Sequence, residues 1–143
     1  MTESHPDYAS WQWLPGRSLG PVRFGQPLGS LLDEHSLDLV EPPYPEADWE
    51  TYVSPDGGQE IHVKCGVVDT VGCFRCLNYR GLNIIGLTVE EMYALLGHPS
   101  EILAPTEGGV PYEYDLHFAS IYIENGVVAS AICYGSDSSS DAD

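Results

Sequence analysis

The sequence is poor in basic residues. Its 143 residues include 22 aspartates and glutamates but only five lysines and arginines, for a formal net charge of −17. The cations are Arg17, Arg23, Lys64, Arg75 and Arg80, so the chain from Gly81 onward has none. Because nucleic-acid binding needs a basic surface that neutralises phosphates, this distribution excludes nucleic acid as the partner. The acidic charge either keeps the protein soluble or steers it toward a cationic surface of another protein, such as a nuclease.

Targeting segments and long apolar runs are also missing. Residues Met1–Ser10 contain neither a basic region nor an apolar run, and nowhere do about eighteen apolar residues follow one another. We therefore expect a cytoplasmic protein without a membrane partner. The segment after Gly135, SDSSSDAD, has no apolar residue larger than alanine, so we expect residues 136–143 to form a disordered acidic tail.

The motifs of common enzyme classes are absent. The sequence has no GxSxG, no HExxH, no P-loop and no Rossmann glycine pattern. Asp115 and His117 alternate along a predicted strand and could pair an acid with a base, but no nucleophile accompanies them. We therefore expect no enzymatic activity and no cofactor, and an enzyme remains an alternative.

The clearest helix signal lies within Gly81–Pro99. Thr88 and Glu91 have the spacing of a capping box, which predicts a helix start at Thr88. From Val89 on, apolar residues recur at i, i+3, i+4 and i+7, and Gly97 ends the pattern. The helix therefore has one apolar stripe that needs a surface to cover.

Strand signals flank this helix. A short apolar run, Leu82–Ile85, precedes it, and two β-rich runs, Tyr112–Ile123 and Val127–Tyr134, follow it. Asn125-Gly126 between the last two favours a tight hairpin turn. The predicted unit is a strand, a helix and antiparallel strands, with the helix on one face.

The same unit occurs a second time, about sixty residues earlier. Lys64–Phe74 aligns without a gap with Glu124–Tyr134, and Cys73 then meets Cys133. In this first copy, a helix over Leu28–His35 follows Pro27, and a proline-rich loop, Glu41–Pro45, comes next.

The sequence therefore predicts one compact α+β domain with two tandem strand-helix-antiparallel-strand repeats, whose helices pack on one face of a sheet. Its parts are an N-terminal extension (1–18), a first repeat (19–76), a second repeat (77–135) and the acidic tail (136–143).

The four cysteines raise the question of a metal site. Cys73-Phe-Arg-Cys76 has the spacing of half a zinc site, and His62 and Cys65 lie nearby in sequence. No second CxxC follows, and the repeat explains Cys73 and Cys133 as equivalent strand positions in a core. We expect free thiols and no metal, with zinc binding by Cys73 and Cys76 as the alternative.

The predicted strands leave one sheet face for a partner. Alternation turns Ile61 and Ile121 toward the core, and it turns His62 and Tyr122 to the opposite face. Tyrosine and tryptophan favour binding surfaces because they offer large contact areas with few rotamers. The residues predicted to bind a partner are Trp49, Glu50, Tyr52, Glu60, His62, Tyr112, Glu113, Tyr114, Asp115, Tyr122 and Tyr134. Each tyrosine could instead complete the core.

Some short motifs resemble known families. The strand-Gly-Thr-x-x-Glu helix start at Ile85–Glu91, the helix end Leu96–Pro99 and the run Asn125–Val128 resemble the small lipoprotein of the outer-membrane barrel-assembly machinery. Tandem copies of this unit are similar to the β-lactamase inhibitory protein, whose two repeats form a concave sheet that grips an enzyme. The resemblance covers Leu19–Tyr134 and implies protein binding by the sheet. The chain shows neither a lipoprotein signal nor a secretion signal, so we expect this binding to occur in the cytoplasm.

These observations predict an acidic protein-binding module. In its most concrete form it is an immunity protein or inhibitor that blocks the active site of a cognate, basic bacterial toxin. The alternatives are a non-catalytic assembly or scaffold protein and a zinc-binding or enzymatic protein.

Overall fold

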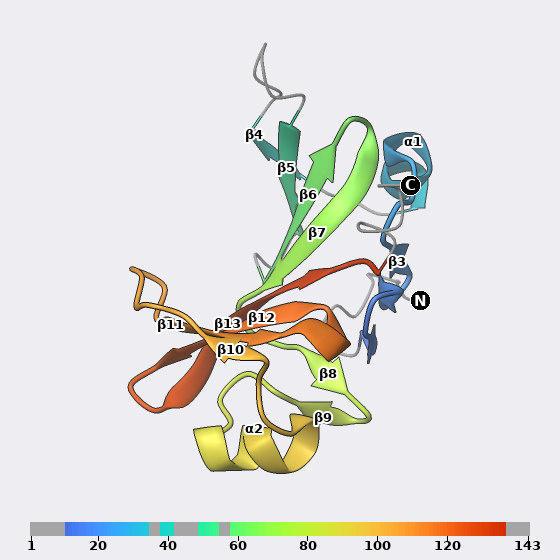
Figure 1. Ribbon diagram of the computed structural model, residues 1–143. Helices are drawn as coiled ribbons and strands as arrows, with labels where there is room; N and C mark the ends of the chain where they lie inside the picture. The colour runs from blue at the N-terminus through green and yellow to red at the C-terminus, as the bar shows by residue number, and fades with distance from the viewer. Residues whose placement is uncertain (1–10, 35–37, 42–48, 55–57, 137–143) are drawn as a thin grey trace, which may run out of the picture.

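The protein is mainly β. The computed structural model describes residues 11–34, 38–41, 49–54 and 58–136. The structure is 52% strand and 15% helix, with its strands in three sheets (Figure 1). The predicted α+β class, with helices packed on one face of a sheet, is therefore wrong. The prediction fails because the two short helices contribute few buried side chains to the core.

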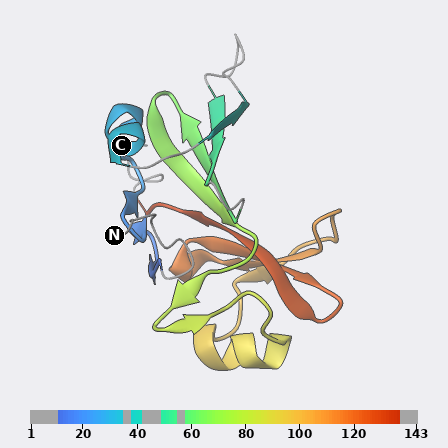
Figure 2. The same ribbon diagram turned by 180° about the vertical axis from the view of Figure 1, so that it is seen from behind.

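The largest sheet has eight antiparallel strands in the order β10-β11-β12-β13-β7-β6-β5-β4 (Figures 1 and 2). Its first four strands along the chain are β4 (Asp38–Glu41), β5 (Trp49–Val53), β6 (Gln59–Lys64) and β7 (Val67–Cys73). The other four are β10 (Glu101–Ile102), β11 (Val110–Tyr114), β12 (Ala119–Glu124) and β13 (Val127–Tyr134). The sheet therefore joins two sets of four strands through the pair β7–β13.

The two sets pair their strands in the same way. In β6–β7, His62 pairs with Thr70, and the register shifts after His62. In β12–β13, Tyr122 pairs with Ser130, and the register shifts after Tyr122, each position lying 60 residues after its counterpart. The β7–β13 ladder places Gly72 opposite Ile132, which are also 60 residues apart. Corresponding strands therefore meet edge to edge in opposite directions.

The predicted Asn-Gly turn is confirmed. It joins β12 to β13 with positive φ at Asn125 (56°) and Gly126 (82°), which suits the tight turn of a twisted hairpin. Cys65 (55°) and Gly66 (84°) form the corresponding turn between β6 and β7. The predicted strand over Tyr112–Ile123 is wrong in its continuity, because the 3₁₀ helix η2 (Asp115–His117) separates β11 from β12.

The two helices are short. α1 covers Leu28–Glu34 and α2 covers Val89–Leu96. The predicted capping box of α2 is confirmed: the Glu91 N–H donates to the Thr88 hydroxyl, and the Thr88 N–H donates to the Glu91 carboxylate. No helix in the described part of the chain has the length and apolar character needed to cross a bilayer.

Backbone contacts attach each helix at a hairpin rather than along the sheet. Gly86 N–H donates to the Val128 carbonyl, and Val128 N–H donates to the Leu87 carbonyl just before α2. Before α1, Gly25 and Gln26 make the same pair of bonds with Val68. Both views show α1 beside the β6–β7 hairpin (Figures 1 and 2).

Extended segments supply much of the core that was expected from helices. The helices contribute Leu31, Met92 and Leu96 as buried side chains, whereas the chain around the two small sheets contributes more. These sheets contain β1 (Trp13–Leu14), β2 (Ser18–Leu19) and β3 (Val22–Arg23), and β8 (Asn78–Tyr79) and β9 (Leu82–Asn83). The buried residues in and around them are Trp11, Trp13, Leu19, Val22, Leu77, Tyr79 and Ile84.

Part of the predicted N-terminal extension therefore belongs to the folded body. Trp13 is 1% exposed, and its ring lies 5.3 Å from that of Tyr79. The Gln12 side chain accepts a hydrogen bond from the Gly81 N–H. Residues 1–10, His35, positions 42–45 of the proline-rich loop and residues 137–143 of the predicted tail lie outside the described residues.

Candidate functional site

The candidate site is the face of the eight-stranded sheet that points away from the core. On the core side, Ile61, Val71, Cys73, Ile121 and Cys133 are fully buried. Most alternating residues on the other side are partly or fully exposed, and we call these the outer face; Thr51 and Pro111 lie on this side but are buried. The outer face consists of Glu60, His62, Lys64, Thr70, Phe74, Glu113, Ser120, Tyr122, Ser130, Ile132 and Tyr134.

The centre of the outer face lies where β7 pairs with β13. Gly72 has no side chain, and the Phe74 ring covers it: a Cβ on Gly72 would lie 3.4 Å from the ring. Ile132 stands opposite Gly72 in the ladder. Phe74 is 42% exposed, so an aromatic ring is available to a partner at this point.

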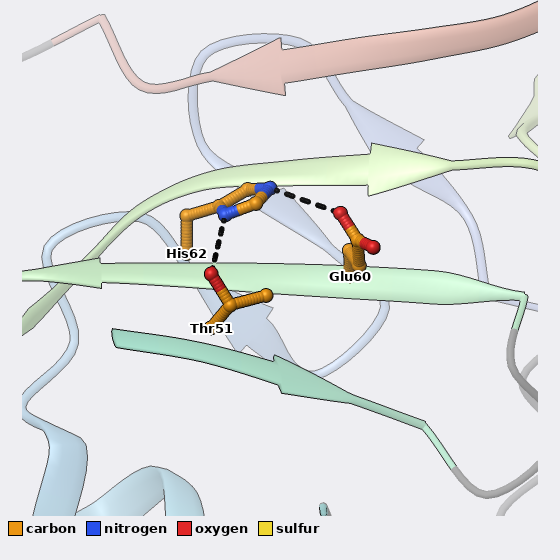
Figure 3. A network of polar contacts seen from close by, with 3 residues as sticks. All are labelled: Thr51, Glu60 and His62. Atoms are coloured by element: carbon orange, nitrogen blue, oxygen red, sulfur yellow. Dashed lines mark hydrogen bonds and ion pairs between the residues drawn. The ribbon is translucent and has the colours of Figure 1, made fainter. Parts of the chain in front are cut away.

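His62 forms a polar network on this face, with Thr51 from β5 and Glu60 from its own strand (Figure 3). Its Nδ1 lies 3.2 Å from the Thr51 hydroxyl, and its Nε2 lies 3.4 Å from a Glu60 carboxylate oxygen. In a neutral imidazole protonated at Nε2, His62 donates to Glu60 and accepts from Thr51. Thr51 is only 3% exposed, so its hydroxyl is unsuited to attack a substrate. The network therefore fixes the His62 ring rather than assembling a nucleophile.

The corresponding part of β11–β12 carries Tyr122 in place of His62. Its Cα partner is Pro111, as Thr51 is the partner of His62. One edge of the Tyr122 ring faces Gly108, where a Cβ would lie 3.6 Å from the ring. Beside it, the Ser120 hydroxyl donates to the Glu113 carboxylate at 2.7 Å. Gly108 therefore lies against one side of the Tyr122 ring, and the Glu113 carboxylate lies nearby on the neighbouring strand β11.

Tyr134 completes this face near the end of β13. Burial, followed by the nearby carboxylates of Asp115 and Glu113, raises the pKa of its phenol. Its ring meets that of Phe118 edge to face, with the centroids 6.2 Å apart. The phenol therefore stays protonated at neutral pH and can donate a hydrogen bond.

Three tyrosines predicted for the partner surface lie on the other side. Tyr52 pairs with Ile61, Tyr112 with Ile121 and Tyr114 with Ala119, all core-facing positions. Tyr52 is 6% exposed and Tyr114 is 2% exposed, whereas Tyr112 packs against the core from its edge. Their assignment to the partner surface is corrected here, because strand register turns them inward.

Hydrogen bonds explain how these tyrosines are accommodated. The Tyr114 hydroxyl donates to the Gly97 carbonyl at 2.9 Å, and the Tyr52 hydroxyl donates to Glu50 at 3.2 Å. Burial raises the pKa of both phenols, and Glu50 adds to the shift at Tyr52. Glu50 is therefore engaged with the buried tyrosine and is separate from the outer face.

The remaining predicted residues are scattered. Trp49 pairs with Lys64 in the β5–β6 ladder, and its side chain lies outside the described residues. Asp115 is exposed at the start of η2, where its N–H donates to the Ser100 hydroxyl. The predicted strand alternation of Asp115 and His117 is wrong because both belong to η2.

His117 instead joins an aromatic cluster. Its ring lies within 6.2 Å of the rings of Trp13, Tyr79 and Tyr114, measured between centroids. Burial lowers its pKa, and the positive charge of Arg80 lowers it further. His117 therefore favours its neutral form and helps to bind the N-terminal segment to β8.

The candidate zinc ligands do not form a cluster. Cys73 is in the core, whereas Cys65 is exposed at the hairpin turn and His62 lies on the outer face. Within the described ranges, no three His, Cys, Asp or Glu side chains lie close enough to hold a metal ion.

Phe74 and Ile132 were not among the predicted partner residues. Alternation with Val71 and Cys73 predicts that Phe74 points to the outer face, and the repeat alignment matches it with Tyr134, although it was not named as a partner residue. The outward direction of Ile132 could not be predicted in this way. Its apolar side chain suggests a core position, and only the strand register shows that it points outward.

The fold resembles two solved structures. The uncharacterized protein YfeY of Escherichia coli superimposes with a TM-score of 0.60 at 10% identity, over 86% of this chain and 99% of that chain. A cysteine-rich secretory protein of Staphylococcus aureus matches with a TM-score of 0.55 at 15% identity, over 90% of this chain and 50% of that chain. No protein-family model matches the sequence, and no curated protein matches it either. The likeness to both structures is therefore one of fold alone.

Proposed function

We propose that this protein is an acidic binding module that docks its outer face on a basic surface of another protein. The partner is a toxin or another enzyme whose active site the module blocks, so that the module acts as an immunity protein or inhibitor in the cytoplasm. The resemblance to the β-lactamase inhibitory protein, which grips its enzyme with a sheet, agrees with this mode of binding.

The observation that carries the proposal is the composition of the outer face. Three aromatic side chains, Phe74, Tyr122 and Tyr134, are accessible there beside the carboxylates of Glu60 and Glu113. Aromatic anchors surrounded by charged groups are typical of protein-binding surfaces. Tyr122 and Tyr134 belong to strands β12 and β13, and Phe74 directly follows β7, so little backbone entropy is lost when a partner binds.

Charge favours a basic partner. The chain has a formal net charge of −17, and only one of its five cations, Lys64 at the end of β6, belongs to the outer face. Opposite charge on the partner would speed the encounter, and the acceleration would weaken as salt is added. A substrate-binding cleft that normally receives an anionic substrate has the required chemistry.

The experiment begins with the neighbouring genes. An adjacent gene that encodes a basic enzyme domain is expressed with and without this protein, and enzyme activity is titrated against the purified module. We expect stoichiometric inhibition by the native protein. Alanine at Phe74 or Tyr122 should weaken binding by at least about 2 kcal/mol if these residues are anchors.

Leu116→Ala is the matched control, because Leu116 is 88% exposed and lies on η2, apart from the outer face. It should leave affinity unchanged. Full inhibition by a Phe74→Ala/Tyr122→Ala double variant that remains folded would refute the proposed surface, and failure to inhibit any basic neighbour would refute the inhibitor function.

The sheet edges give little support to the assembly alternative. Edge strand β10 has two residues, and edge strand β4 has four with an irregular register. Such short edges offer few free backbone groups for pairing with a second copy.

A further inference from the structure

A polar cavity lies apart from the residues of the outer face, between the N-terminal strands and the end of β13. It has a volume of about 450 Å³. Its lining includes Gly16, Arg17, Arg23, Phe24, Gly25 and Ser136, and among the described residues no aspartate or glutamate lines it. In a chain with 22 acidic residues and five basic ones, two of the five cations share this one cavity.

The backbone holds both arginines in place. Arg17 N–H donates to the Leu14 carbonyl, and the Arg17 carbonyl accepts from Phe24 N–H. Arg23 N–H donates to the side-chain oxygen of Gln26, whose own N–H donates to the Arg23 carbonyl. Gln26 is 3% exposed, so this support lies beneath the cavity. The starting points of both side chains are therefore fixed, although the guanidinium groups themselves reach solvent.

The guanidinium groups are the donors left for a ligand. The backbone N–H groups of Phe24, Gly25 and Gln26 are already used by Arg17, Val68 and Arg23. Within the part of the chain that the structure describes, neither Arg17 nor Arg23 forms an ion pair. Two guanidinium groups without carboxylate partners match the charge and the planar hydrogen-bonding geometry of an oxyanion.

We propose that Arg17 and Arg23 form a binding site for one oxyanion, a carboxylate or phosphate group. This site does not depend on the proposed docking of the outer face. Its ligand group can belong to a free molecule or to the acidic residues that follow Ser136 in the sequence, since Ser136 lines the cavity. The same guanidinium chemistry serves both sources.

Titration of the full chain with inorganic phosphate, followed by amide NMR, tests the site. Sodium chloride at the same ionic strength is the reference. We expect saturable shifts confined to the amides around Gly16, Arg17 and Gly25. Arg17→Gln and Arg23→Gln should each weaken binding about tenfold or more, because each removes a charge-assisted contact. Arg75→Gln, which removes an exposed cation outside the cavity, should leave the affinity unchanged.

A variant with Asp137, Asp141 and Asp143 all changed to Asn, called the Asn chain, distinguishes a free anion from the protein's own carboxylates as the ligand. Equal phosphate binding by both chains assigns the site to a free anion. Binding by the Asn chain alone shows that the chain's own carboxylates occupy the site. If neither chain shows saturable shifts at these amides, or if Arg75→Gln weakens binding as much as Arg17→Gln does, the proposal is wrong. None of these outcomes bears on inhibition through the outer face.

Discussion

The thiols of Cys73 and Cys133 lie next to each other inside the core, where β7 pairs with β13. Cys73 pairs with Ala131, and Cys133 pairs with Val71, so the two cysteines are diagonal neighbours in the ladder. Burial raises the pKa of the Cys133 thiol, and the contact with Cys73 raises it further. Both side chains therefore behave as small buried groups rather than as nucleophiles.

Thiol labelling checks this arrangement. In the native protein, Cys65 should react quickly with an aromatic disulfide reagent because it is exposed, and Cys73 and Cys133 should react only on unfolding. The measurement is the number of thiols modified before and after urea is added. Rapid native labelling of a Cys65→Ser variant at two or more thiols would contradict the burial of this pair.

Tyr114 and Tyr122 should differ sharply in their effect on stability. Tyr114→Ala removes a buried ring and should cost about 3–5 kcal/mol, whereas Tyr122→Ala on the outer face should cost much less. Tyr114→Phe removes only the hydrogen bond to Gly97 and should cost about 0.5–1.5 kcal/mol. Urea unfolding of the three variants gives these free energies. Equal losses for both alanine variants would place Tyr122 in the core.

His117 should make stability depend on pH. Its folded pKa is lowered by burial and by Arg80, and the rings around it are Trp13, Tyr79 and Tyr114. The unfolded chain then takes up a proton more readily, so this contribution is present above the ordinary pKa of about 6.5 and is lost as pH falls below it.

The urea midpoint, followed from pH 7.5 to 5.5, measures this dependence. The native protein should lose more stability over this interval than His117→Gln does, because the other titrating groups are common to both. His98→Gln is a suitable control because His98 is exposed. Parallel pH profiles for the native protein and His117→Gln would show that His117 does not contribute.

Two glycines should respond in opposite directions to alanine. Gly20 has φ of +59°, and a Cβ there would lie 2.3 Å from Trp11, so Gly20→Ala should destabilise the N-terminal strands. Gly29 lies inside α1 with open space around it, and Gly29→Ala should stabilise by about 0.5–1 kcal/mol. Thermal unfolding of both variants tests the pair. A higher melting temperature for Gly20→Ala would contradict the contact with Trp11.

Local signals in the sequence were enough to predict the elements with short-range causes. The capping of α2 by Thr88 and Glu91 depends on residues three positions apart, and the turn at Asn125-Gly126 depends on two adjacent backbones. Both were predicted correctly. The outward direction of His62 and Tyr122 followed from alternation with buried isoleucines on their own strands.

Features set by long-range contacts were not predictable in this way. The inward direction of Tyr112 and Tyr114 depends on the pairing of β11 with β12 across η2, which interrupts the apparent β run. The burial of Trp13 depends on Tyr79 and His117, which lie far along the chain. Arg17 and Arg23 line a cavity together with Ser136, which is more than a hundred residues away in the sequence and follows β13.

The antiparallel meeting of β7 and β13 has the symmetry of a homodimer. Gly72 faces Ile132 across the ladder, and the neighbouring pairs on either side exchange corresponding positions, as they would about a two-fold axis. A chain with only one set of four strands would expose this strand as an open edge and could cover it with the same strand of a second copy. Gene duplication and fusion of such a self-pairing ancestor would give the eight-stranded sheet without requiring any new interface.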